Sequence, residues 1–84
     1  MMIKFSTAAW EDYLYWQMTD KTLLKRINQL IRNIQRDPFS GIGKPEPLKH
    51  QLTGFWSRRI DSCHRLVYAV EDNTILIAQC RDHY

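Results

Sequence analysis

The last five residues of the sequence, Cys80-Arg81-Asp82-His83-Tyr84, place a guanidinium, an imidazole and a phenol close together. An imidazole can donate a proton near neutral pH, a guanidinium can bind a phosphate, and an aromatic ring can stack on a nucleobase. The ends of a chain are usually frayed, but the strand-like run at 75–78 leads straight into this segment. We therefore predict that the tail is held against a sheet, with its side chains accessible to solvent.

Residues upstream of the tail could complete the site of a metal-independent ribonuclease. Cleavage of RNA by transesterification needs a base for the 2′-hydroxyl, positive charge for the phosphorane and an acid for the departing 5′-oxygen. Glu46 is a candidate base, because a carboxylate between Lys44 and Lys49 should keep its charge. Arg65 is a candidate phosphate ligand, and His83 is a candidate acid. If these side chains supply all three functions, no metal ion or cofactor is needed.

Other residues could assist such a site. Three could add positive charge: Lys49, Arg59 and Arg81. Three aromatic rings could stack on a base of flexible single-stranded RNA: Phe55, Trp56 and Tyr84.

Each candidate also has an ordinary structural interpretation. Glu46 could be a solvated loop acid, Arg65 an exposed strand residue with a carboxylate partner, and His83 a surface histidine. We assign His50 and His64 to turn or strand-edge positions, although either could contact RNA. On chemistry alone, a nuclease and a plain nucleic-acid-binding module both remain open.

The composition indicates one domain that covers residues 1–84. Apolar residues make up 44% of the chain, which is enough for a compact core and argues against disorder. Residues 1–5 lack the apolar stretch of a secretory signal, and no run is long enough to span a membrane, so we expect a cytoplasmic protein. Cys63 and Cys80 have no metal-ligand spacing, and we expect two reduced, packed thiols.

The positive charge is concentrated in the middle of the chain. The net charge is +3, but residues 20–59 contain nine Lys and Arg against three acids. Such a segment suggests a polyanionic partner, or it is simply the solvated face of a helix.

The apolar pattern predicts a short strand at 2–5 and two helices. Ser6 or Thr7 should cap the first helix, Asp20 should cap the second, and Pro38 should end it. The second helix has a core-facing stripe made of Leu23, Leu24, Ile27, Leu30, Ile31 and Ile34. The stripe of Trp10, Tyr13 and Trp16 in the first helix is either core or a surface for a partner.

The second half of the chain predicts a loop and then a sheet. All three prolines lie in the loop at 37–47, where Pro45 and Pro47 should hold Glu46 in an extended conformation. Strand-like runs follow at 48–52, 55–60, 65–70 and 74–80. We predict an α+β domain in which the helices cover one face of an antiparallel sheet and leave the other face free.

Five segments of the chain resemble the YoeB/Txe toxins of the RelE-like superfamily of bacterial toxin–antitoxin systems. The segments are Trp-Glu-Asp-Tyr-Leu-Tyr-Trp at 10–16, Gly-Lys-Pro-Glu-Pro-Leu-Lys-His at 43–50, Gly-Phe-Trp-Ser-Arg-Arg-Ile at 54–60, His-Arg-Leu-Val-Tyr at 64–68 and the closing Cys-Arg-Asp-His-Tyr. The resemblance spans nearly the whole chain. It implies a microbial-ribonuclease-like α+β fold.

The resemblance also implies a function and its residues. It implies an endoribonuclease, an mRNA interferase that enters the ribosomal A site, cuts mRNA there and stops translation. The implied base is Glu46, the phosphate-binding residue is Arg65, and the acid and terminal tyrosine are His83 and Tyr84. Two basic residues are implied to line the same site, Lys49 and Arg59.

The resemblance implies partners as well: a cognate antitoxin, the ribosome with its mRNA, operator DNA only through the antitoxin complex, and a possible homodimer. Two alternatives remain, a non-catalytic RNA- or ribosome-binding protein of the same fold and an autoregulatory protein that only binds its antitoxin. The intact set of Glu46, Arg65 and His83 favours the enzyme, because binding alone has no use for a base and an acid together.

Overall fold

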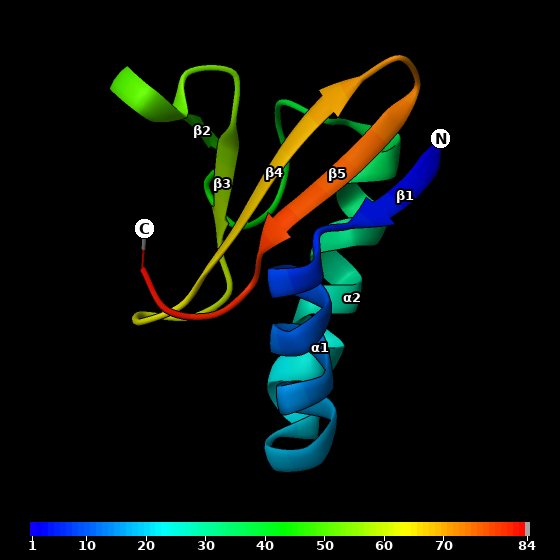
Figure 1. Ribbon diagram of the computed structural model, residues 1–84, viewed down its shortest axis with the longest axis vertical. Helices are drawn as coiled ribbons and strands as arrows, with labels where there is room; N and C mark the ends of the chain where they lie inside the picture. Colours follow the sequence, from blue (N-terminus) through cyan, green and yellow to red (C-terminus); the bar gives the residue numbers. More distant parts are fainter. Residues whose placement is uncertain (84) are drawn as a thin grey trace.

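The computed structural model describes residues 1–83 and packs two helices on one face of a five-stranded sheet (Figure 1). In chain order the elements are β1 (Met2–Phe5), α1 (Thr7–Thr19), α2 (Lys21–Arg36), β2 (Glu46–Pro47), a 3₁₀ helix (His50–Leu52), β3 (Trp56–Arg59), β4 (Arg65–Glu71) and β5 (Thr74–Gln79). The predicted α+β fold is therefore confirmed.

The sheet is mixed and has the strand order β1-β5-β4-β3-β2. Strands β2 to β5 pair antiparallel, as predicted. β1 instead pairs parallel to β5, with Met2 opposite Thr74 and Phe5 opposite Ile77. The chain therefore starts at one edge of the sheet, crosses its face as two helices, and re-enters at the other edge with β2.

Both helices begin and end where the sequence predicts. The Ser6 hydroxyl accepts a hydrogen bond from the N–H three residues on (3.0 Å), and the Asp20 carboxylate accepts two from the first turn of α2 (3.1 Å each). Each such cap stabilises its helix by about 1 kcal/mol. α2 ends at Arg36, just before Pro38. Within residues 1–83, neither helix is long and apolar enough to cross a membrane.

The core lies between α2 and the inward face of the sheet. The predicted stripe of α2 is buried at Ile27, Leu30, Ile31 and Ile34. The sheet contributes Leu66, Tyr68, Ile75 and Ile77, and Ile60 joins them directly after β3. In the aromatic stripe of α1, Trp16 is 5% exposed and lies in the core, which is one of the two predicted roles, whereas Trp10 is 46% exposed.

Two local predictions are wrong. Segment 48–52 is not a strand, because His50 adopts a positive φ of 60° and the chain turns there into a 3₁₀ helix. Cys63 is exposed rather than packed, since it lies at the tip of the turn between β3 and β4. Cys80 is fully buried, as predicted.

Candidate functional site

The strand register gathers candidate residues on the face of the sheet that the helices leave open. Paired residues on neighbouring strands point to the same face, and successive residues alternate. Glu46 pairs with Ser57, and Arg59 pairs with Arg65. Arg58, which lies between Ser57 and Arg59, is buried in the core, so Glu46, Arg59 and Arg65 share the open face. Sheet spacing places the backbones of Glu46 and Arg65 roughly 12 Å apart, a gap that two long side chains can close around a phosphodiester.

A short edge strand holds Glu46. Its two flanking prolines predict an extended backbone, which is what β2 provides. Just before β2, the Gly43 carbonyl accepts a hydrogen bond from the Arg59 N–H (2.7 Å), which fixes the chain that leads to the carboxylate. Glu46 and Lys49 line one hollow of about 480 Å³, so the predicted cation lies beside the predicted base.

Arg65 begins β4 directly after a tight turn. The Asp61 carboxylate accepts hydrogen bonds from the N–H groups of Cys63 (2.8 Å) and His64 (2.7 Å). Partial burial acts to raise the pKa of Asp61, but these N–H groups and the nearby charge of Arg65 outweigh it, so the pKa lies below its ordinary value. Arg65 Nη1 donates to the carbonyls of Asp61 (2.9 Å) and His64 (3.1 Å). Both of these bonds use Nη1, so the turn holds the guanidinium by one of its three nitrogens.

The tail is held against the sheet, as predicted. The Arg65 N–H donates to the Asp82 carbonyl (3.0 Å), and the Asp82 N–H donates to His64 Nδ1 (2.8 Å). That carbonyl belongs to the peptide joining Asp82 to His83, so the backbone of His83 begins beside Arg65. The tail accordingly passes the turn between β3 and β4 (Figure 1), with the His83 side chain exposed. Tyr84, also predicted for the site, lies outside the described residues.

A family model for the "YoeB-like toxin of bacterial type II toxin-antitoxin system" matches residues 5–84. The chain belongs to this family. Toxin YoeB of Escherichia coli K12 is 62% identical over 84 residues, covering 100% of both chains.

Solved structures agree with this assignment. A YoeB/ParE toxin from Agrobacterium tumefaciens has a TM-score of 0.98 at 48% identity, covering 100% of both chains. The Staphylococcus aureus toxin of a YoeB-YefM complex has a TM-score of 0.93 at 53% identity, and its YoeB dimer has 0.94 at 54%. Both Staphylococcus matches cover 100% of this chain and 98% of the other.

Arg58 is a residue of this YoeB-family chain whose importance the sequence did not reveal. It belongs to the basic segment 20–59 but is completely buried and adds nothing to the surface charge. Its guanidinium donates to the hydroxyl of Tyr68 (3.2 Å), the carbonyls of Asp37 (2.7 Å), Ser40 (2.9 Å) and Ile42 (3.0 Å), and the side-chain oxygen of Asn33. Its burial could have been predicted from the alternation of β3, because Arg58 lies between Trp56 and Ile60 on the apolar side of that strand. Arg58 thereby fixes the loop that leads to Glu46.

Two auxiliary residues lie outside the predicted site. The Arg81 guanidinium stacks over the Tyr15 ring of α1, 3.6 Å from its centroid, in a cation–π contact. Trp56 lies on the inward side of β3 and packs on Phe39, with 4.9 Å between ring centroids. The sequence prediction was wrong for both, because the tail reaches α1 and because Trp56 has the same strand parity as Arg58.

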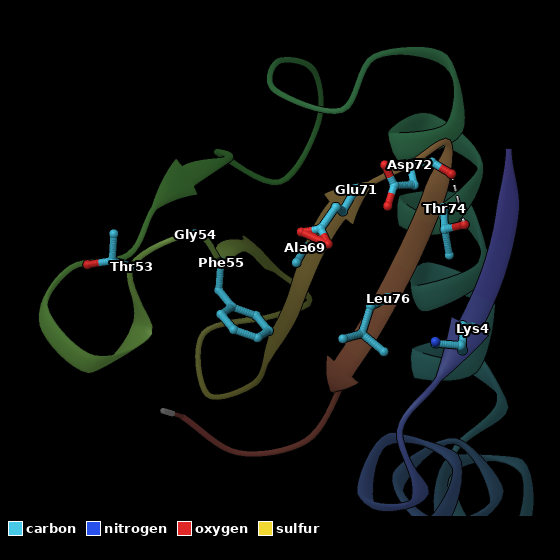
Figure 2. Close-up of a pocket in the computed structure, with 9 residues that line it drawn as sticks. All are labelled: Lys4, Thr53, Gly54, Phe55, Ala69, Glu71, Asp72, Thr74 and Leu76. Atoms are coloured by element: carbon cyan, nitrogen blue, oxygen red, sulfur yellow. Dashed lines mark hydrogen bonds between the residues drawn. The ribbon is translucent and has the colours of Figure 1, made fainter.

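A second hollow, of about 420 Å³, lies on the same open face (Figure 2). Figure 2 shows the Phe55 ring beside Ala69, with Glu71 and Asp72 at one end. None of the candidate base, acid or phosphate-binding residues lines it. Two carboxylates at its edge would repel a phosphate, so this hollow is separate from the candidate catalytic site.

Proposed function

We propose that this toxin is a metal-independent endoribonuclease that cuts mRNA in the ribosomal A site and so stops translation. The supporting observation is that Glu46, Arg59 and Arg65 share the open face of the sheet, while the peptide before His83 is hydrogen-bonded to Arg65. The proposal requires a base, a phosphate ligand and an acid to act together on this surface. Membership of the toxin family supplies the physiological setting.

The proposed reaction is an in-line transesterification. Glu46 takes the proton of the 2′-hydroxyl, and the 2′-oxygen attacks phosphorus. Arg65 binds the phosphorane through its guanidinium, with added charge from Arg59 and Lys49. His83 protonates the 5′-oxygen as its bond to phosphorus breaks. The products are a 2′,3′-cyclic phosphate and a 5′-hydroxyl. We assign Tyr84 to the same site because the resemblance to the toxin family implies it.

The proposed ribosome dependence is supported by basic residues far from the chemistry. Lys25 and Arg32 are exposed on α2, and Arg26 is partly exposed. Contacts from these residues to ribosomal RNA phosphates would weaken steeply with added salt. This role also requires a cytoplasmic protein.

We further propose that the toxin binds a cognate antitoxin and can form a homodimer, by analogy with the YoeB-YefM complex and the YoeB dimer from Staphylococcus aureus. Met2, Ile3 and Trp10 are 72%, 40% and 46% exposed, which leaves apolar surface at the β1 edge and on α1 for a protein partner. Operator DNA would be reached only through the antitoxin complex.

The direct test is primer extension on a defined mRNA held on purified ribosomes. Wild type should cut within the A-site codon, and both Glu46→Gln and His83→Gln should reduce the rate by roughly 10²–10⁴-fold while retaining ribosome binding. Glu71→Gln is the matched control, because it removes a carboxylate from the same face outside the site. An mRNA with one 2′-deoxynucleotide before the cut should resist cleavage.

The outcomes separate the alternatives. A 5′-phosphate product, or cleavage of the deoxy substrate, would contradict the transesterification. Ribosome binding without any cut would favour the non-catalytic binding protein. Antitoxin binding with neither cutting nor ribosome binding would favour the autoregulatory protein.

A further inference from the structure

The peptide that carries His83 is held from two sides. The Asp82 carbonyl accepts from the Arg65 N–H (3.0 Å), which continues the sheet pairing, and the Asp82 N–H donates to the His64 side chain (2.8 Å). Asp82 has a positive φ of 63°, a conformation that is uncommon for non-glycine residues and that the two hydrogen bonds hold in place. His64 therefore stabilises the backbone turn from which His83 projects.

The hydrogen bond defines the state of the His64 ring. A backbone N–H can only donate, so Nδ1 must offer a lone pair and the neutral ring carries its proton on Nε2. The imidazole is 20% exposed. The Asp82 carboxylate lies 3.9 Å from the same Nδ1, which is too far for a hydrogen bond, so the backbone N–H is the principal partner.

The ring of His64 is itself fixed by α1. It meets the Trp16 ring edge to face, with 4.8 Å between centroids, and Trp16 Nε1 donates to the Cys80 carbonyl (2.8 Å). Trp16 is 5% exposed and lies in the core. A continuous path of contacts thus runs from the core through two rings to the tail peptide.

We propose that His64 is a positioning residue, which orients the general acid His83 by accepting the Asp82 N–H through Nδ1. The inference rests on the proposed nuclease function and extends it to a residue that contacts neither the phosphate nor the leaving group. Without the acceptor, the Asp82 turn relaxes and the His83 imidazole is displaced from the 5′-oxygen. The cleavage rate then falls because the leaving group is protonated more slowly, while the roles of Arg65 and Glu46 are unchanged.

Two variants separate the hydrogen bond from packing. His64→Asn keeps an acceptor near the position of Nδ1, whereas His64→Leu fills similar space against Trp16 without one. Thermal unfolding should show that both fold. In the ribosome assay, His64→Leu should lower the single-turnover cleavage rate by about tenfold or more, a part of the ~10²–10⁴-fold that a general acid supplies. His64→Asn should recover most of that loss.

A sulfur leaving group identifies the affected step. In an mRNA with a single 5′-bridging phosphorothiolate at the cut site, sulfur replaces the departing 5′-oxygen. The leaving group is then a thiolate, which departs without protonation by an acid. On this substrate, His64→Leu and His83→Gln should both come within about threefold of wild type. On ordinary mRNA, adding His64→Leu to His83→Gln should slow cleavage no further, because both changes remove one function.

The failures are distinguishable. If wild type does not cut, the proposed function fails. If wild type cuts and His64→Leu is unimpaired, is equally slow on both substrates, or adds its full loss to His83→Gln, the positioning role is wrong and His64 acts elsewhere or only in folding.

Discussion

Arg58 and Arg59 are neighbours on β3, yet their identical side chains have opposite roles. Arg58 is 0% exposed, and protein oxygens surround its guanidinium. Arg59 is exposed on the open face and pairs across the strands with Arg65. Successive residues of a strand point to opposite faces, so a shift of one residue in β3 would exchange the two roles. Position in the sheet, and not residue type, decides which arginine can meet a phosphate.

The buried arginine nevertheless shapes the open face. Three carbonyls that it binds belong to the loop at 37–42, which leads into β2 and Glu46. Gly43 closes this loop with a φ of +82°, and a Cβ there would lie 2.8 Å from Leu30 and 3.2 Å from Arg58. Only a glycine therefore fits where the loop passes Leu30 and the backbone end of the Arg58 side chain. One arginine stabilises the loop that leads to Glu46, and its neighbour is exposed on the open face.

The largest effect should come from Arg58→Met, which keeps much of the side-chain length but removes every donor. We expect the free energy of unfolding to fall by about 3 kcal/mol or more, because each buried polar group left unsatisfied costs about 1–3 kcal/mol. Urea unfolding followed by tryptophan fluorescence measures this. Arg58→Lys should recover only part, since an ammonium cannot reproduce the planar fork. A loss below about 1 kcal/mol in Arg58→Met would contradict the structural role.

Arg59→Ala should show the reverse pattern. Its side chain is exposed, so the free energy of unfolding should change by no more than about 0.5 kcal/mol. Cleavage on ribosomes should fall by about tenfold or more, because a cation facing the phosphorane is removed. Arg36→Ala is the matched control, since it removes an exposed charge at the end of α2. Equal losses in both variants would mean that general positive charge matters and the position of Arg59 does not.

Tyr68→Phe tests a smaller part of the buried network. The Tyr68 hydroxyl accepts from Arg58 Nε (3.2 Å) and donates to the Pro38 carbonyl (2.7 Å). Its removal should lower the free energy of unfolding by about 1–2 kcal/mol at about pH 8.

The pH dependence of that difference has a definite sign. Burial raises the pKa of Tyr68, although the hydrogen bond and charge of Arg58 oppose the rise. The unfolded chain releases this proton first, above about pH 10, so the stabilisation is complete below that pH and is lost as pH rises through the folded pKa. The difference between wild type and Tyr68→Phe should therefore shrink in unfolding curves recorded near pH 10.5. A constant difference would mean that Tyr68 has the same pKa in both states.

Local patterns predicted the elements that depend on nearby residues. The 3.6-residue stripe of α2, the Ser6 and Asp20 caps and the stop at Pro38 need no information from distant parts of the chain. The open face followed from the same logic, because two helices can cover only one side of a small sheet. Periodicity could not supply the candidate site residues, which came from their side-chain chemistry and from the resemblance to the toxin family.

The misses share a long-range cause. Segment 48–52 has strand-like residues, but β3 pairs with Glu46–Pro47 instead, and only the folded sheet decides that register. Residue type alone suggests an RNA-stacking role for Trp56 and surface charge for Arg58. The alternation of β3 instead puts both on the face of the sheet that Arg59 does not occupy. His64 was assigned to a turn, and nothing local indicates that the tail, 18 residues later, would donate to its ring.

The two cysteines show the same contrast between a buried and an exposed side chain, and changing the exposed one should not affect function. Cys63 is exposed at the turn, whereas burial raises the pKa of Cys80 to about 12, with a further contribution from the Asp12 carboxylate. At about pH 8, one thiol should react quickly with Ellman's reagent and the second only when the chain opens. Cys63→Ser should remove the fast phase and leave cleavage unchanged. Two fast thiols in wild type would mean that the packing of α1 on the tail opens readily.

The rate of the slow Cys80 reaction therefore measures how often the buried side of the sheet opens. This rate is governed by the population of opened molecules, which rises as the free energy of unfolding falls. Arg58→Met should therefore accelerate it, whereas Arg59→Ala should leave it at the wild-type rate even though cleavage is impaired. Acceleration in Arg59→Ala would show that the exposed arginine also stabilises the fold, and the division of roles between the two faces would no longer hold.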